Sequence, residues 1–396
     1  MKVLFVINSI HTKGNGLATS ARRTIKYLKE AGVDVRVLSS KNSDPSGEQP
    51  DFPLNDYNLP LFGFLVRKQG FAFAEINKDV IKRAVAWADL IHFEEPFDLE
   101  IAVADEAEKA GVPMTATYHL HPENLFATVH LQNDPILNRL TMRFWRKKVF
   151  NRCEIVQCPT ENVRKRLAKW HYRSELRVIS NGLVIEDTLP AIPESNLVLS
   201  DAKYRIITIG RYSVEKDLIT LLKAMRYSKV ASETELILAG RGPTERTLKK
   251  YADKLYKKGY LKYPVKFGFF ALPDLQKLAL ASDLYIHCAI IEVEGLSCLE
   301  AIRVGLVPVI AKGEKTATSQ FALSEQSVYK EKNPKELAAR IDYWLTHEEE
   351  RKAEAVRYKE MDSAYDIQKS IAELKIMFED AIEKYRAKKT HKKSSR

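Results

Sequence analysis

Short apolar runs alternate with longer amphipathic stretches along the first half of the chain. Residues 2–8 form an apolar run, residues 17–31 repeat apolar positions at helical spacing, and residues 33–39 return to an apolar run. Further apolar runs follow at residues 88–93, 113–118, 154–158 and 176–179. Apolar strands separated by amphipathic helices are typical of βαβ units, so this pattern predicts a doubly wound parallel sheet.

The same alternation starts again after a loop rich in proline and acidic residues. That loop, residues 186–200, has the composition of a linker between domains. Beyond it, apolar runs are followed by helical stretches at residues 205–210, 235–239, 265–268, 284–288 and 307–311. We therefore expect an α/β protein with two Rossmann-like domains, 1–190 and 191–360. Because ligands of such sheets bind at the carboxyl ends of the strands, we expect the site in a cleft between the domains.

The end of the chain has a helical pattern. Residues 365–385 place apolar side chains at helical spacing, among them Ile371, Leu374 and Phe378. We expect a long helix within residues 361–387. The last segment, residues 388–396, is too polar and charged to fold alone, which predicts a disordered basic tail.

Composition narrows the choice of partners. The 396 residues carry 63 Lys and Arg against 52 Asp and Glu, a net charge of +11 that favours nucleotide phosphate, an anionic membrane surface or nucleic acid. No segment approaches the ~20 apolar residues of a spanning helix. The apolar run at the N-terminus is too short for a signal peptide. We therefore expect a cytoplasmic protein with at most peripheral contact at the inner face of the membrane.

Two carboxylates, Glu292 and Glu300, lie on either side of Gly295 after a predicted strand. Over this separation an ideal helix turns through ~800°, so the two would not share a face if both were helical. We expect a helix to start near Gly295, with Glu292 in the preceding loop. The unpaired amides of Gly295, Leu296 and Ser297 would suit a phosphate. Phosphate and hydroxyl binding together favour a nucleotide sugar, although acids at a helix start also occur without a ligand.

Other loops at strand ends carry glycines or cations. Gly14 and Gly16 follow the first strand but do not complete the Gly-x-Gly-x-x-Gly fingerprint, since Thr19 stands at the third position. NAD binding is therefore disfavoured. Arg211 and Lys216 follow the first strand of the second domain, where fixed cations would neutralise a diphosphate, or form only a solvated charge pair.

Two further loops have both a functional and a structural interpretation. Gly240 either allows the backbone to approach a nucleotide closely, or it belongs only to the turn before a helix that has Pro243 in its first turn. His119 and His121 come just after a predicted strand. At that position His119 would donate to a sugar hydroxyl or a phosphate, whereas isolated histidines are more often structural.

Basic and aromatic side chains interleave at residues 139–152, with Phe144, Trp145 and Phe150 among the basic ones. This pattern predicts an amphipathic helix on an anionic lipid surface, and the alternative is a packed helix with a solvated charged face. A second apolar stretch, residues 62–66, is also followed by basic residues. We expect lipid contacts from Arg143, Trp145, Arg146, Lys147 and Lys148.

In chain order, these segments resemble the retaining glycosyltransferases of family four. The resemblance rests on Gly14 and Gly16, His119, Ser180-Asn181-Gly182, Gly210-Arg211 with Lys216, Gly240 and Glu292-x7-Glu300. It implies the GT-B fold, with two Rossmann-like domains facing a cleft, an N-terminal acceptor domain and a C-terminal donor domain. The final helix would cross back to the N-terminal domain.

The resemblance also implies roles for the matching residues. Arg211 and Lys216 would bind the donor diphosphate, Glu292 the transferred sugar and Glu300 the ribose. His119 would touch the sugar near the reacting centre. Backbone around the donor phosphates would come from Gly16, Gly240, Gly295, Leu296 and Ser297. No metal or other cofactor is implied.

The sequence departs from the family pattern at three places. Ala289 stands where many relatives carry serine, Glu294 adds a third acid close by, and Leu183-Val184 replace a hydrophobic-aspartate pair. These departures affect donor choice more than fold.

We therefore expect a retaining hexosyltransferase that uses a UDP-sugar such as UDP-glucose and a membrane-associated acceptor of the diacylglycerol type. Enzyme alternatives are a capsule or exopolysaccharide transferase with a lipid-linked saccharide acceptor, and a nucleotide-sugar epimerase. A basic nucleic-acid-binding protein would explain the charge, but no recognition-helix, zinc or RNP motif is found. A non-catalytic sugar-nucleotide binder is the remaining alternative.

Overall fold

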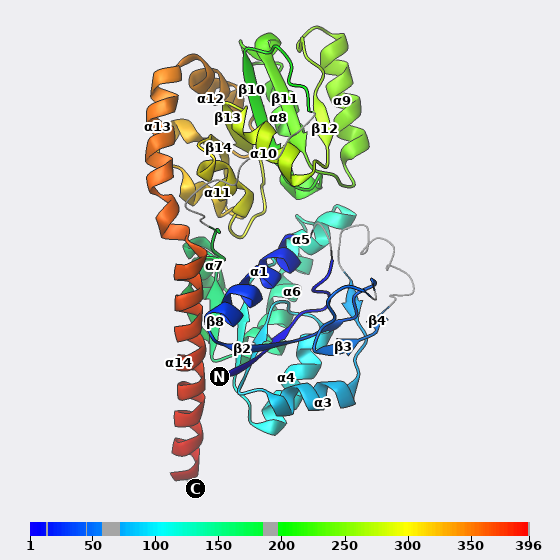
Figure 1. Cartoon of the computed structure of the whole chain (residues 1–396), viewed down its shortest axis with the longest axis vertical. Helices are drawn as coiled ribbons and strands as arrows, with labels where there is room; N and C mark the ends of the chain where they lie inside the picture. Colours follow the sequence, from blue (N-terminus) through cyan, green and yellow to red (C-terminus); the bar gives the residue numbers. More distant parts are fainter. Residues whose placement is uncertain (13–14, 45, 58–71, 185–196, 395–396) are drawn as a thin grey trace. The chain divides into compact units, whose positions relative to one another are not determined.

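The computed structural model describes residues 1–12, 15–44, 46–57, 72–184 and 197–394 (Figure 1). The chain forms two compact units. The N-terminal unit comprises Met1–Gly182 and Ile367–Arg396, and the C-terminal unit comprises Leu183–Asp366. Gly14 and the apolar stretch at residues 62–66 lie outside the described residues.

The N-terminal unit is built on a seven-stranded sheet in which all neighbouring strands are parallel. The order across it is β3 (Phe52–Leu54), β2 (Asp34–Ser40), β1 (Lys2–Val6), β6 (Leu90–Phe93), β7 (Met114–Thr117), β8 (Ile155–Cys158) and β9 (Glu175–Val178). A separate antiparallel pair joins β4 (Asp56–Tyr57) and β5 (Phe73–Ala74). Strand order reverses between β1 and β6, as in Rossmann folds.

The helices of this unit follow from caps and apolar spacing. In α1 (Gly16–Glu30), the Asn15 side chain accepts from the Leu17 amide at 2.9 Å, and buried residues recur at helical spacing from Ala18 to Leu28. The other helices are α3 (Lys78–Trp87), α4 (Asp98–Ala110), α5 (Pro122–Phe126), α6 (Pro135–Lys148), α7 (Glu161–Lys169) and α14 (Ile367–Ser394), with short 3₁₀ turns at Ala127–Val129 and Phe150–Arg152.

The C-terminal unit has a six-stranded parallel sheet. Its order is β12 (Lys266–Gly268), β11 (Thr234–Ala239), β10 (Tyr204–Ile209), β13 (Leu284–His287), β14 (Val307–Lys312) and β15 (Val328–Lys330). Its helices are α8 (Leu218–Ala224), α9 (Glu245–Lys257), α10 (Leu272–Leu280), α11 (Leu296–Arg303), α12 (Pro334–Thr346) and α13 (Glu348–Glu360). Here the strand order reverses between β10 and β13, so both units have the predicted Rossmann-like sheet.

The C-terminal helix α14 packs on the N-terminal unit, as predicted from the sequence. Phe378 of α14 is buried against the rings of Phe5, at a centroid distance of 6.3 Å, and His92, at 5.1 Å. Within the described residues, no helix has both the length and the apolar composition needed to cross a bilayer.

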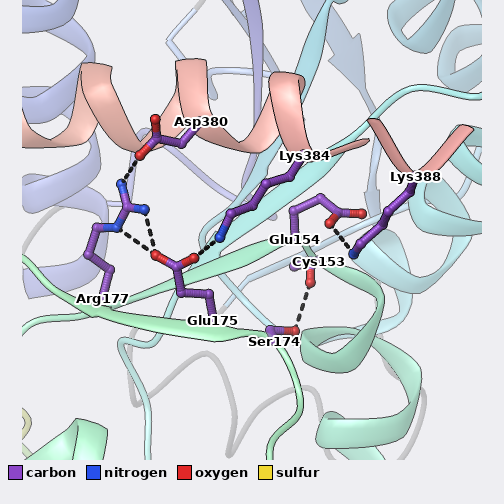
Figure 2. Close-up of polar contacts among 8 residues, drawn as sticks. All are labelled: Cys153, Glu154, Ser174, Glu175, Arg177, Asp380, Lys384 and Lys388. Atoms are coloured by element: carbon purple, nitrogen blue, oxygen red, sulfur yellow. Dashed lines mark hydrogen bonds and ion pairs between the residues drawn. The ribbon is translucent and has the colours of Figure 1, made fainter. Parts of the chain in front are cut away.

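One face of α14 also forms a row of ion pairs with the sheet (Figure 2). Asp380 accepts from Arg177 at 2.7 Å, Lys384 bonds to Glu175, and Lys388 bonds to Glu154. The three helix residues are spaced by four, so they share one face. α14 continues to Ser394, beyond the expected end of the helix and into the segment predicted to be disordered. Glu175 of β9 and Glu154, which directly precedes β8, compensate the charges of Lys384 and Lys388, and the sequence pattern did not reveal these partners.

Candidate active site

The predicted site residues fall into two groups, one in each unit. The C-terminal group gathers where β10 and β13 end, which is the switch point of that sheet. Parallel strands bring their carboxyl ends to the same edge, and the crevice at a switch point is where such sheets bind ligands. A small pocket there is lined by residues that include Gly210, Arg211, Lys216, His287 and Ala289.

Lys216 and Glu292 form a hydrogen-bonded ion pair in this group. Lys216 ends a 3₁₀ turn after β10, and Glu292 lies between β13 and α11. The backbone of Glu292 is fixed on both sides, since its amide donates to the Lys315 carbonyl at 3.0 Å and its carbonyl accepts from the Ala317 amide at 2.9 Å. A cation and a carboxylate are thereby held side by side at the pocket edge.

The Glu292 carboxylate is ionised. Burial would raise its pKa, but the adjacent Lys216 charge, with a smaller effect from nearby His287, outweighs burial and holds the pKa of Glu292 below its usual value. An ionised carboxylate accepts hydrogen bonds and donates none. Glu292 is therefore suited to bind hydroxyl groups of a ligand.

His287 supports Glu292 and was missed from the sequence. It ends β13, is buried, and places Nε2 3.7 Å from Glu292 and 3.2 Å from the Thr318 hydroxyl. Its Nδ1 lies 3.2 Å from the Tyr285 hydroxyl, which donates to Ser297 at 3.0 Å. Burial lowers the pKa of His287, so the ring is neutral. The sequence did contain one clue to His287, because it stands in an apolar run. A polar ring that is buried in such a strand needs hydrogen-bond partners.

Helix α11 begins directly after Gly295, as predicted. Gly295 has φ of +95°, and a Cβ there would lie 2.4 Å from the Thr318 hydroxyl oxygen, so both conformation and space require glycine. Leu296 and Ser297 form the first turn, whose amides carry the positive end of the helix dipole. Glu300 lies within the helix and is exposed, whereas Glu292 precedes it.

Arg211 is held by a second carboxylate that the sequence did not reveal. Its guanidinium donates to Glu215 at 2.8 Å, and the Glu215 side chain is buried. The Glu215 carbonyl in turn accepts from the Ile290 amide at 2.9 Å, which ties this loop to the segment after β13. Arg211 and Lys216 therefore lie on one loop that is fixed to the neighbouring strand end.

Gly240 has a structural reason to be glycine. A Cβ at this position would lie 1.9 Å from the Gly210 carbonyl oxygen, so the turn after β11 packs directly on the loop after β10. This contact accounts for the glycine without a nucleotide.

In the N-terminal unit, His119 follows β7 and contacts a residue that the sequence did not single out. Its Nε2 lies 2.6 Å from Glu94, which follows β6. His121 is fully buried and bonds to the Tyr118 hydroxyl at 3.2 Å, as expected of a structural histidine. Gly16 is the first residue of α1, and a Cβ there would meet nothing within 4 Å.

Two of the predicted lipid contacts on α6 are wrong. Trp145 is only 3% exposed and packs edge-on against Phe97 at a centroid distance of 6.1 Å. Arg146 is half-buried and donates to the Trp170 carbonyl at 2.6 Å. Both lie on the inner face of the helix.

The outward face of α6 is nevertheless amphipathic. Arg143, Lys147 and Lys148 are exposed, as expected. The exposed apolar side chains on this face belong instead to residues spaced by four, Ile136 at 67% exposure, Leu140 at 56% and Phe144 at 45%. We call these three residues the α6 stripe.

Two family models match the chain in succession. Glycosyltransferase Family 4 matches residues 14–187, and Glycosyl transferases group 1 matches residues 194–360. Alpha-monoglucosyldiacylglycerol synthase of Streptococcus pneumoniae is 25% identical over 323 residues, which are 79% of this chain and 71% of that protein.

Solved structures share the fold over nearly the whole chain. Sucrose-phosphate synthase from Thermosynechococcus elongatus matches with a TM-score of 0.72 and 14% identity, covering 96% of this chain and 98% of that one. Anabaena HepE in complex with UDP and glucose matches with a TM-score of 0.66 and 17% identity, covering 96% and 100%.

Proposed function

The chain belongs to the GT-B glycosyltransferases, which transfer a sugar from a nucleotide sugar, and on this premise we propose that it moves glucose from UDP-glucose to a diacylglycerol-type lipid with retention of configuration. The observation that carries the proposal is the Lys216–Glu292 pair at the switch point of the C-terminal sheet. It joins an anion-binding group to a hydroxyl-binding group, and UDP-glucose offers both chemistries.

Each part of the donor has a matching group in the C-terminal unit. Lys216 and Arg211 would bind the diphosphate, with help from the amides that begin α11. Glu292 would accept hydrogen bonds from the glucose hydroxyls. Glu300, exposed on α11, would bind the ribose hydroxyls.

In the proposed reaction, the bond between glucose C1 and the diphosphate oxygen breaks as a bond to the acceptor oxygen forms on the same face. The acceptor proton passes to the departing phosphate oxygen. Negative charge builds up on the diphosphate in the transition state, so fixed cations at Lys216 and Arg211 stabilise that state more than the bound substrate. Glu292 orients the sugar through its ionised carboxylate and does not supply a proton.

The choice of donor and acceptor is supported by two of the similar proteins. HepE was solved with UDP and glucose, and the pneumococcal relative is named for glucosyl transfer to form a glucosyldiacylglycerol. These are properties of those proteins, and this chain would share them through the donor group described above.

A membrane acceptor also requires a surface that meets the membrane, and α6 offers one. The α6 stripe is flanked on the helix by exposed Arg139, Arg143 and Lys147. Apolar side chains beside a basic row are typical of helices that lie at the interface of an anionic bilayer. We propose that α6 docks there as a peripheral contact, with the net charge of +11 adding long-range attraction.

The test is transfer of radiolabelled glucose from UDP-glucose to vesicles that contain diacylglycerol and anionic phospholipid. We expect label in the organic phase and an α anomeric proton in the NMR spectrum of the product. Label that appears only in a water-soluble saccharide would contradict the lipid acceptor. If no nucleotide sugar supports transfer to any acceptor, the enzymatic proposal itself is wrong.

A further inference from the structure

A buried carboxylate contacts His119 at the switch point of the N-terminal sheet. Glu94 follows β6, and its amide donates to the Val6 carbonyl of β1 at 3.1 Å. Its Oε2 lies 2.6 Å from His119 Nε2. The exposed fractions of the two side chains are 2% for Glu94 and 7% for His119. This contact therefore joins the ends of two adjacent strands in a nearly dry environment.

Glu94 depends on His119 for its charge. A buried carboxylate is costly unless it is paired with a cation and hydrogen-bonded. Burial alone would raise the pKa of Glu94, but the His119 charge and hydrogen bond outweigh it, and the pKa is lowered. Glu94 is therefore an ionised carboxylate that is hydrogen-bonded to His119.

The other side of Glu94 is closed by His92. Glu94 Oε1 lies 3.6 Å from His92 Nε2, and the two ring nitrogens of His92 each lie 2.9 Å from a hydroxyl, Thr115 for Nδ1 and Thr117 for Nε2. Burial lowers the pKa of His92 to about 4, so this ring is neutral near pH 7. His92 thus limits movement of Glu94 without competing for its charge.

The next acid along the chain points to other partners. Glu95 is also buried, but its carboxylate accepts from the Asn8 amide at 2.8 Å and from the Asn8 side chain at 2.9 Å. Asn8 also contacts Glu100, and burial raises the pKa of both Glu95 and Glu100. Two adjacent carboxylates therefore have different partners, and Glu94 is the one committed to His119.

We propose that Glu94 is a positioning residue that holds His119 by Nε2 and leaves Nδ1 as the ring nitrogen that contacts the donor sugar. This inference rests on the proposed function and on the role that the family resemblance implies for His119, contact with that sugar near the reacting centre. A ring fixed through one nitrogen loses less freedom when the other nitrogen binds, so the contact is made in productive geometry. Glu94 itself does not touch substrate.

A double-mutant cycle separates positioning from a general structural effect. Glu94→Ala should lower kcat about tenfold or more in the wild-type background, and by less than about twofold in a His119→Ala background, because Glu94 acts through His119. Glu94→Gln keeps an acceptor for Nε2–H and should recover part of the loss. The matched control is Glu95→Gln, whose effect should be the same factor in both backgrounds. Equal losses from Glu94→Ala in the two backgrounds would overturn the proposal.

A second measurement does not depend on activity. In ¹⁵N-histidine NMR spectra of the full chain, the His119 Nε2–H signal, assigned by its loss in His119→Ala, should shift in Glu94→Gln and stay in place in Glu95→Gln. An unchanged signal in Glu94→Gln would contradict the positioning role. If the wild-type protein transfers no sugar but the signal shifts, the proposed function has failed while the contact holds.

Discussion

Lys216 bonds to Glu292 across the switch point of the C-terminal sheet, so the loop after β10 and the loop after β13 are joined by opposite charges. Neither loop reveals this contact alone, because the two residues are far apart in the sequence. Their charges are fixed before any ligand binds, which reduces the reorganisation needed when a diphosphate sugar arrives.

Glu292→Gln should reduce kcat about 100-fold while leaving the fold intact, because the amide keeps the shape but loses the charge that pairs with Lys216. Kinetics with UDP-glucose and circular dichroism check this. Gln at exposed Glu349 is the matched control and should have no effect on kcat. If Glu292→Gln keeps full activity, Glu292 does not bind the transferred sugar.

Glu300→Ala should act differently, since Glu300 is proposed to hold the ribose. We expect the donor KM to rise about tenfold with little change in kcat. The reason is that a charged hydrogen bond to the ribose is present in both the bound substrate and the transition state, so its loss weakens both equally. Calorimetry with UDP should show the same weakening. A large fall in kcat at unchanged UDP affinity would reverse the roles assigned to the two acids.

Acid should destabilise the C-terminal unit partly through Glu292. Its folded-state pKa lies below the ordinary value of about 4.3, so the folded state binds fewer protons there. The resulting stabilisation is present above the ordinary pKa and is lost as the pH falls towards the folded-state pKa. The Tm should therefore drop less between pH 6 and pH 3.5 in Glu292→Gln than in the wild type. Equal drops would mean that the carboxylate is not stabilised by Lys216.

The α6 stripe should govern membrane binding. Replacing Ile136, Leu140 and Phe144 with serine removes exposed apolar surface, so partition to anionic vesicles should fall about tenfold or more. Activity on a detergent-dispersed acceptor should change little. The control is Val356→Ser on α13, an equally exposed apolar residue, which should bind vesicles normally. Unchanged binding by the triple variant would place the membrane contact elsewhere.

The ion pairs and the buried ring of α14 should contribute unequally to stability. Phe378→Ala should cost about 3–5 kcal/mol, because it opens a cavity beside Phe5 and His92. Lys384→Ala should cost at most about 1 kcal/mol, since its partner Glu175 is partly exposed to solvent. Thermal unfolding compares them, with exposed Lys369→Ala as the reference. A larger effect from Lys384 than from Phe378 would contradict this ranking.

The strands that lie inside each sheet were predictable from the sequence because both of their faces are buried. The three-residue edge strands β3 and β15 were missed, whereas β12, equally short and also at an edge, was expected at residues 265–268. Three residues give no periodicity to detect, so such strands are found only where other signals flank them. The position of Glu292 before α11 was predictable from Gly295. Lys216 was predicted from the sequence as a cation on another loop, but its pairing with Glu292 was not.

The errors at α6 and the omission of Glu94 have physical reasons. Trp145 was assigned to lipid because it is aromatic and has basic neighbours, but helical geometry places it on the same inward face as buried Met142. In the sequence, Glu94 does not differ from other acidic residues that follow a strand. Only the pairing of β6 with β7 in the folded sheet shows that it contacts His119. Such contacts depend on strand order, which a single sequence does not specify.

The chain leaves the N-terminal unit after Gly182 and returns to it at Ile367. At the point of exit and return, the Leu183 amide donates to the Tyr365 carbonyl at 2.6 Å, so the two ends of the C-terminal unit meet. A nonsense mutation near codon 366 would therefore spare the C-terminal unit and remove a core helix from the N-terminal one. Conversely, a fragment spanning residues 183–366 has adjacent ends and could be excised or circularly permuted without cutting a strand or helix of its sheet.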